Sequence, residues 1–121
     1  MNPDDIVFTV YNPHRDITFT LKEGSTETFG KQHIEREDKK LQGKMDAIKK
    51  AVEDSDVAYI DKRHSDRERI YCLGADDAKP NMYIKVITEY QTKQDANIIT
   101  AWHTAEISPA EGEITYVKPR I

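Results

Sequence analysis

A single helical stripe of apolar residues, followed by short segments that alternate in polarity, limits the fold of this chain more than any other feature. The stripe consists of Ile34, Leu41, Met45, Ile48 and Val52. At about 100° per residue these side chains share one helix face, which predicts one long helix that begins between about residues 26 and 31 and ends before 53–56. Gly30 and Gly43 are its weak points, since each disfavours helix by about 1 kcal/mol relative to alanine.

Elsewhere apolar residues alternate with polar ones, which is typical of strands with one buried face. At the N-terminus two such runs flank the turn-forming residues 12–16, which predicts a hairpin over about 5–22. Further strands are predicted at 57–60, 69–73, 82–90, 97–103 and, at an edge, 114–117. We therefore predict an α+β fold, in which an N-terminal β-hairpin precedes one long α-helix packed on an antiparallel sheet of about four strands.

One face of this sheet must be apolar, because the helix stripe has to be covered. The residues expected on that face are Ile70, Cys72, Met82, Ile84, Val86, Ile98 and Trp102. The alternation then places Tyr83, Lys85, Ile87 and His103 on the opposite face.

Length and composition indicate one domain. A chain of 121 residues fits a single domain over 1–121, with its core at about 26–107. It has no apolar run that could span a bilayer and no secretory pattern at its start, so we expect a cytoplasmic protein without membrane partners. The one cysteine, Cys72, excludes an intramolecular disulfide. A net charge of −4 argues against a protein that coats nucleic acid, but not against an enzyme that contacts a few phosphates.

The sequence lacks the motifs of phosphate loops and of short metal sites, so we expect no cofactor and no metal. Its five glycines stand apart from one another, which excludes a glycine-rich nucleotide loop. Its four histidines include no pair one helical turn apart, the commonest spacing of a helical zinc site.

His33 is the first candidate for acid–base chemistry. It lies at the flank of the apolar stripe, where a side chain can face a cleft between helix and sheet. Glu37 follows one turn later and can hold the imidazole or raise its pKa. From its position alone, an ordinary polar residue at a helix boundary is the favoured interpretation of His33, and the catalytic one stays open at this point.

Two further clusters carry chemistry-bearing side chains. Arg67 and Arg69 enter a strand just before Tyr71, and arginine offers a planar fork for phosphate oxygens. The alternative is a charged loop that is neutralised by its neighbouring acids. The second cluster ends a strand and contains Thr100, Trp102 and His103. Core packing and β-propensity are the alternatives for Trp102 and Thr100.

The order of these motifs resembles one nuclease superfamily. The chain contains, in this order, a helix with a His-Ile pair, an Arg-x-Arg-x-Tyr run entering a strand, a long apolar strand and a closing Ile-Ile-Thr-Ala-Trp. This order is similar to that of the barnase, EndoU, colicin-D and RelE-like superfamily, in particular its phage- and mobile-element-associated branch. The similarity covers about residues 29–104. It implies a ribonuclease-like domain of toxin or phage-effector type, with an antitoxin or immunity protein as partner, and the fold predicted above.

The resemblance also implies roles for individual residues. His33 would transfer the proton, with Glu37 or His103 as its acid–base partner, while Arg69 or Arg67 would contact the phosphate. Thr100 would donate a hydrogen bond to that phosphate, and Tyr71, Trp102 and His103 would help to bind RNA. The reaction would be metal-independent cleavage through a 2′,3′-cyclic phosphate. The alternative is a catalytically inactive relative that serves as an interaction or phage accessory protein, which the acidic balance and Glu37-Asp38 favour.

Overall fold

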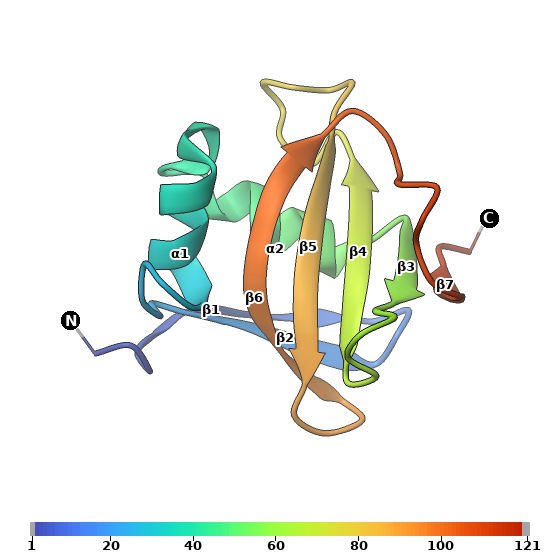
Figure 1. Ribbon diagram of the computed structural model, residues 1–121, viewed down its shortest axis with the longest axis horizontal. Helices are drawn as coiled ribbons and strands as arrows, with labels where there is room; N and C mark the ends of the chain where they lie inside the picture. Colours follow the sequence, from blue (N-terminus) through green and yellow to red (C-terminus); the bar gives the residue numbers. More distant parts are fainter. Residues whose placement is uncertain (1, 120–121) are drawn as a thin grey trace.

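The computed structural model describes residues 2–119, which form one continuous sheet and two short α-helices (Figure 1). The elements, in chain order, are β1 (Ile6–Asn12), β2 (Ile17–Lys22), α1 (Gly30–Glu37), the 3₁₀ turn η1 (Lys39–Leu41), α2 (Met45–Glu53), β3 (Val57–Ile60), β4 (Arg67–Leu73), β5 (Tyr83–Tyr90), β6 (Asp95–Thr104) and β7 (Ile114–Val117). Among these residues no helix is both long enough and apolar enough to cross a membrane.

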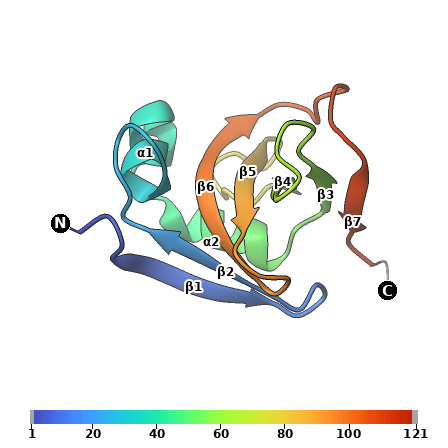
Figure 2. The same ribbon diagram turned by 60° about the horizontal axis from the view of Figure 1, so that its bottom comes forward.

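The strands follow the order β1-β2-β6-β5-β4-β3-β7. All neighbours are antiparallel except β2 and β6, which run parallel where Thr18–Thr20 pairs with residues 95–97. Figure 2 shows the consequence: the N-terminal hairpin crosses beneath the end of the sheet and continues it around a bend. The hairpin predicted over 5–22 is therefore present, but it belongs to the main sheet.

The predicted single long helix is wrong. It is divided at Asp38, which has extended backbone angles (φ −128°, ψ 96°) and whose side chain accepts a hydrogen bond from the Lys40 amide. A second break follows at Gly43, which adopts a φ of 72°. The apolar stripe is still buried, since Ile34 and Ile48 are fully covered, so its periodicity reflected a shared core and not one continuous helix.

The predicted four-stranded sheet is also wrong, and with it the fold class. Seven strands are described, because β2 pairs with the start of β6 and β7 pairs with β3. Edge strands of a four-stranded sheet would leave a row of backbone groups without partners, and the two terminal segments satisfy them. This also corrects the fold that the family resemblance implied.

The main core lies between the sheet and its helices. α2 packs against β1, β4 and β5 on the far side of the sheet in Figure 1, and α1 packs beside β6 and β2. Five of the seven residues predicted for the helix-facing side are buried in this core: Ile70, Cys72, Ile84, Val86 and Ile98. Trp102 was also predicted for the helix-facing side, but it pairs with Lys85 and lies on the opposite face of the sheet.

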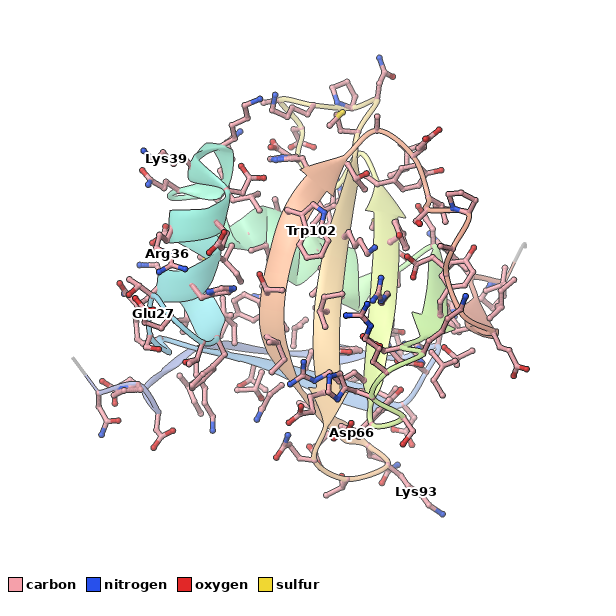
Figure 3. All side chains as sticks on the ribbon, in the orientation of Figure 1. Glu27, Arg36, Lys39, Asp66, Lys93 and Trp102 are labelled. Carbon is pink, nitrogen blue, oxygen red and sulfur yellow. The ribbon has the colours of Figure 1, made fainter. Side chains whose placement is uncertain are left out.

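We call this opposite face the front face, since it is turned toward the viewer in Figure 3. Two rows of cross-strand neighbours run over it: Trp102, Lys85, Tyr71 and Val57 in one, and Thr100, Ile87, Arg69 and Tyr59 in the next. The helix α1 borders the face on one side, and residues 105–113 border it on the other (Figure 1). His103 pairs with Ile84 and is therefore on the helix side, which corrects its predicted placement.

Candidate active site

A hollow with a volume of about 470 Å³ lies between α1 and β6. The residues that line it are His33, Glu37, Asp38, Thr100, Trp102 and His103. Five of these six were candidates from the sequence alone, although α1 and β6 are some 60 residues apart in the chain. We refer to this hollow as the α1–β6 cleft.

The position of His33 depends on the tight loop before α1. Gly24 and Gly30 both have positive φ, and a Cβ at Gly24 would lie 1.8 Å from the Phe29 carbonyl oxygen. Only a glycine permits this close approach, which folds residues 23–29 back over the first turn of the helix. The Thr26 carbonyl oxygen consequently lies 3.0 Å from Nδ1 of His33.

This contact fixes the tautomer of neutral His33. A carbonyl oxygen only accepts hydrogen bonds, so Nδ1 must be protonated and donates a hydrogen bond to the Thr26 carbonyl oxygen. Nε2 then holds the lone pair and is the atom left to accept a proton from another group. An imidazole oriented through one nitrogen, with the other unprotonated, is the arrangement expected of a general base.

Glu37 lies in the same cleft but contacts a different residue. Its carboxylate accepts a hydrogen bond from Nη2 of Arg36 at 2.6 Å. Arg36, which is labelled in Figure 3, lies on the exposed side of α1. That hydrogen bond, together with the charge of Arg36 and a smaller effect of His33, lowers the pKa of Glu37. Glu37 is therefore an ionised neighbour that acts on His33 through space, without a hydrogen bond to it.

His103 was predicted as an alternative acid–base partner, and the structure gives it other contacts. Its Nδ1 lies 2.9 Å from Asp38 and its Nε2 lies 2.9 Å from Asp76. Because carboxylates only accept, both bonds are made at once when the imidazole carries two protons. Through these two contacts His103, whose side chain is 5% exposed, joins the end of α1 to the connection between β4 and β5. Lys44 also pairs with Asp76 in that connection. With both nitrogens occupied, His103 forms a wall of the cleft.

The two acids beside His103 are held in their charged form. Burial raises the pKa of Asp76, but hydrogen bonds from His103 and Lys44 outweigh it and the net pKa is lowered. Burial also raises the pKa of Asp38, and hydrogen bonds from the backbone and ring of His103 and from the Lys40 amide lower it overall.

Thr100 and Trp102 are presented by a rigid strand. β6 contains one extra residue, Ile99, where its register with β5 shifts between Ile87 and Thr88. Such bulges re-aim the following side chains, and here they are the two that enter the cleft. Trp102 lies in front of β6 and β5 in Figure 3, with the Lys85 ammonium 5.3 Å from its ring centroid.

The predicted arginines are outside this cleft. Arg67 pairs with Glu89 at 2.7 Å. Arg69 lies in the same cross-strand row as Thr100, but β5 lies between their strands. Two strand spacings separate the backbones of the two residues by about 10 Å. It lines a second hollow of about 390 Å³ with Lys62, Arg63, Ala110 and Gly112, and we refer to this as the basic hollow.

Arg69 and Tyr71 contact an acid that sequence reasoning did not select. The Glu111 carboxylate accepts hydrogen bonds from Nη1 of Arg69 (3.4 Å), the Tyr71 hydroxyl (3.0 Å) and Nζ of Lys85 (3.0 Å). Tyr71 is completely buried under this contact. Glu111 lies in a segment without helix or strand, so no periodicity could have indicated its direction.

Two other contributors were also missed. Asp38 and Asp76 were not selected as site residues, because a single charged residue at a helix end or in a loop carries no signal of its partner. Within residues 2–119, no group of three or more histidine, cysteine, aspartate or glutamate side chains is arranged to hold a metal ion. Comparisons of the chain with protein-family models, with curated proteins and with solved structures found no match.

Proposed function

We propose that this chain is a metal-independent ribonuclease-like domain of toxin or phage-effector type, with its reaction centre in the α1–β6 cleft. The observation that carries the proposal is the convergence of His33, Thr100 and Trp102 on one hollow from two distant elements. The cleft thus combines an oriented imidazole, a hydroxyl and an aromatic ring, and aromatic rings are the usual stacking partners of single-stranded bases.

The proposed reaction assigns one task to each group. Nε2 of His33 takes the proton of the ribose 2′-hydroxyl, and the 2′-oxygen attacks the adjacent phosphate. The bond from phosphorus to the 5′-oxygen breaks, which leaves a 2′,3′-cyclic phosphate, and the departing 5′-oxygen takes a proton from water or from the protonated His33. Thr100 donates a hydrogen bond to a phosphoryl oxygen. Trp102 stacks on a neighbouring base. An RNA substrate, an antitoxin or immunity protein as partner and a cytoplasmic location belong to the same proposal, as does membership of the barnase and RelE-like superfamily.

The second candidate is an interaction or phage accessory protein without catalysis. A specific observation favours it: Arg67, Arg69 and Lys85, three cations on strands of the front face, each have a carboxylate partner. The cleft itself contains the carboxylates of Glu37 and Asp38. Phosphate would therefore meet little unpaired positive charge in the α1–β6 cleft or on the strands beside it.

Incubation of purified protein with labelled RNA and a chelator tests the proposal. The wild-type chain is expected to yield products with a 2′,3′-cyclic phosphate, and His33→Ala to cleave at least about 100-fold more slowly, as general-base catalysis contributes that much. His64→Ala is the matched control, because His64 is exposed in the loop before β4. Equal cleavage by wild type and His33→Ala refutes the assignment, and absence of cleavage in both supports the second candidate.

A further inference from the structure

The front face contains an unusual arrangement around Glu111. Three donors from two strands, Arg69, Tyr71 and Lys85, all reach a single atom, Oε1 of Glu111. The other carboxylate oxygen, Oε2, is buried and has no hydrogen-bond partner among the described residues. A carboxylate is therefore a poor match for this donor set, since its second oxygen loses the water that it would bind in solution.

The donor set itself is one that recognises an oxyanion with more oxygens. A guanidinium, an ammonium and a phenol hydroxyl together can each donate to a different oxygen of a tetrahedral phosphate. The Lys85 ammonium is further fixed between two aromatic rings, 5.1 Å from the centroid of Tyr71 and 5.3 Å from that of Trp102. Its position therefore does not depend on Glu111 alone.

We propose that Arg69, Tyr71 and Lys85 form a phosphate-binding site on the front face, and that Glu111 occupies this site as an internal substitute for the ligand. The segment 105–113, which carries Glu111, is then an intramolecular strap. The site deepens the proposed function, because in a ribonuclease it would receive an RNA backbone phosphate next to the base stacked on Trp102.

The charges around the site agree with such a ligand. Arg69 also pairs with Asp61 at 3.5 Å, so Arg69, Lys85 and Asp61 together carry one net positive charge once Glu111 leaves. A phosphodiester carries one negative charge. The strap keeps this charge neutralised in the present structure.

An approach route lies beside the strap. The basic hollow is lined by Arg69 and by Ala110 and Gly112, the two residues on either side of Glu111. Lys62 and Arg63 complete it, and neither side chain takes part in an ion pair of the described residues. An anion attracted by these two cations reaches the site at the point where Glu111 is inserted.

The strap is attached to β4 and β5 through few contacts. Its segment contains neither helix nor strand, and the hydrogen bonds that join it to these two strands run through Glu111 and through the Ser108 amide, 3.4 Å from the Tyr71 hydroxyl. At its far end the Glu113 carbonyl accepts from the Ile60 amide and anchors the segment to β3. Displacement of Glu111 therefore disturbs only the middle of the strap.

Titration of the full chain with inorganic phosphate tests the site, with binding measured calorimetrically against chloride at equal ionic strength. Glu111→Gln removes the charge but keeps the shape, and it is expected to bind phosphate at least ten-fold more tightly than wild type. Glu113→Gln, an exposed neighbour in the same strap, is the matched control and should bind as wild type does. Equal phosphate binding by a folded Glu111→Gln and by wild type overturns the proposal.

Two additional measurements keep the test decisive. If Glu111→Gln does not fold, amide hydrogen exchange of residues 106–112 in the wild-type chain should be faster in phosphate than in chloride, and unchanged exchange overturns the proposal. A short deoxyoligonucleotide, which lacks the attacking 2′-hydroxyl, should also bind Glu111→Gln more tightly. Binding of phosphate alone would support the oxyanion site and overturn its assignment to backbone phosphate. None of these readouts depends on cleavage, so they separate failure of this site from failure of the proposed ribonuclease.

Discussion

Asp76 and Asp77 are adjacent acids with opposite environments, and replacing each by asparagine tests how the cleft is held together. The side chain of Asp76 is 5% exposed and accepts hydrogen bonds from His103 at 2.9 Å, Lys44 at 3.1 Å and the Ala78 amide at 3.1 Å. The side chain of Asp77 is 97% exposed and lies 3.7 Å from Lys50. The same chemical change therefore removes a buried anion in one case and a solvated one in the other.

The expected loss for Asp76→Asn is about 3 kcal/mol of unfolding free energy. Removing one partner of a buried ion pair leaves the other charge uncompensated, which costs about 3–5 kcal/mol, and the asparagine oxygen recovers part of this by accepting one hydrogen bond. For a domain of this size that loss corresponds to a decrease of about 10 °C in Tm. Asp77→Asn should change the free energy by less than about 0.5 kcal/mol, as is usual for exposed pairs.

Urea denaturation at pH 7, with the midpoint and the slope fitted separately, measures both values. A loss below about 1 kcal/mol for Asp76→Asn, or equal losses for the two variants, would refute the view that hydrogen bonds to two acids hold His103 in place. It would also remove the reason to treat His103 as a wall of the cleft instead of a proton-transfer group.

The pH dependence of this difference has a defined sign. The pKa of Asp76 is lowered in the fold, because hydrogen bonds from His103 and Lys44 outweigh the opposing effect of burial. A carboxyl with a lowered pKa contributes its stability above the unfolded value, near 3.9, and loses it as the pH falls through the folded value. The stability gap between wild type and Asp76→Asn should therefore decrease as the pH falls below about pH 4.

Two further predictions concern the loop before α1 and the single thiol. Gly24→Ala should destabilise the chain far more than Gly43→Ala in urea denaturation. Both glycines have positive φ, which costs alanine about 1–2 kcal/mol, but of the two only Gly24 would place the new Cβ against a backbone atom. Equal losses of unfolding free energy would contradict this prediction. Burial, together with the nearby charges of Asp56 and Asp54, raises the pKa of Cys72 to about 12. At pH 8 the folded chain should therefore react with a thiol reagent orders of magnitude more slowly than the urea-unfolded chain, and rapid labelling of the folded chain would count against a buried Cys72.

The strands were predictable because each is a short local pattern. The segments predicted at 57–60 and 114–117 coincide with β3 and β7, and those at 69–73, 82–90 and 97–103 differ from β4, β5 and β6 by a few residues at their ends. The partners of the strands were not predictable in the same way. Nothing in the alternation of β2 states that it will run parallel to β6, since that pairing depends on how the whole sheet bends.

The helix was mispredicted because periodicity records burial and not continuity. Ile34 and Ile48 share one core although α1 and α2 are separate helices. The interruption comes from polar chemistry at single positions, namely the extended backbone of Asp38 and the positive φ of Gly43. Gly43 was recognised as a weak point, but the hydrogen bonds between Asp38 and His103 join residues 65 positions apart and leave no local trace.

For the candidate site, too, the sequence indicated which side chains could act but not which of them lie together. His33, Glu37, Thr100 and Trp102 were selected for what their side chains can do, and they line one cleft. Arg69 was selected on the same grounds but lies in another hollow. The difference arises because the first group lies on α1 and β6, which pack against each other. The side chain of Arg69 is instead held by Asp61 and Glu111, which lie in irregular segments.

The two candidate functions and the strap can be separated by combining the substitutions already described. If the strap restrains a ribonuclease, then Glu111→Gln frees a net positive charge on the front face and should raise cleavage, and this gain must vanish when His33→Ala is added, because positive charge alone cannot take the 2′-proton. If the chain is an interaction protein, Glu111→Gln raises only the affinity for phosphate-containing ligands, and adding His33→Ala changes nothing further. The dependence of the Glu111 effect on His33, and not the size of either effect alone, therefore tells catalysis from binding.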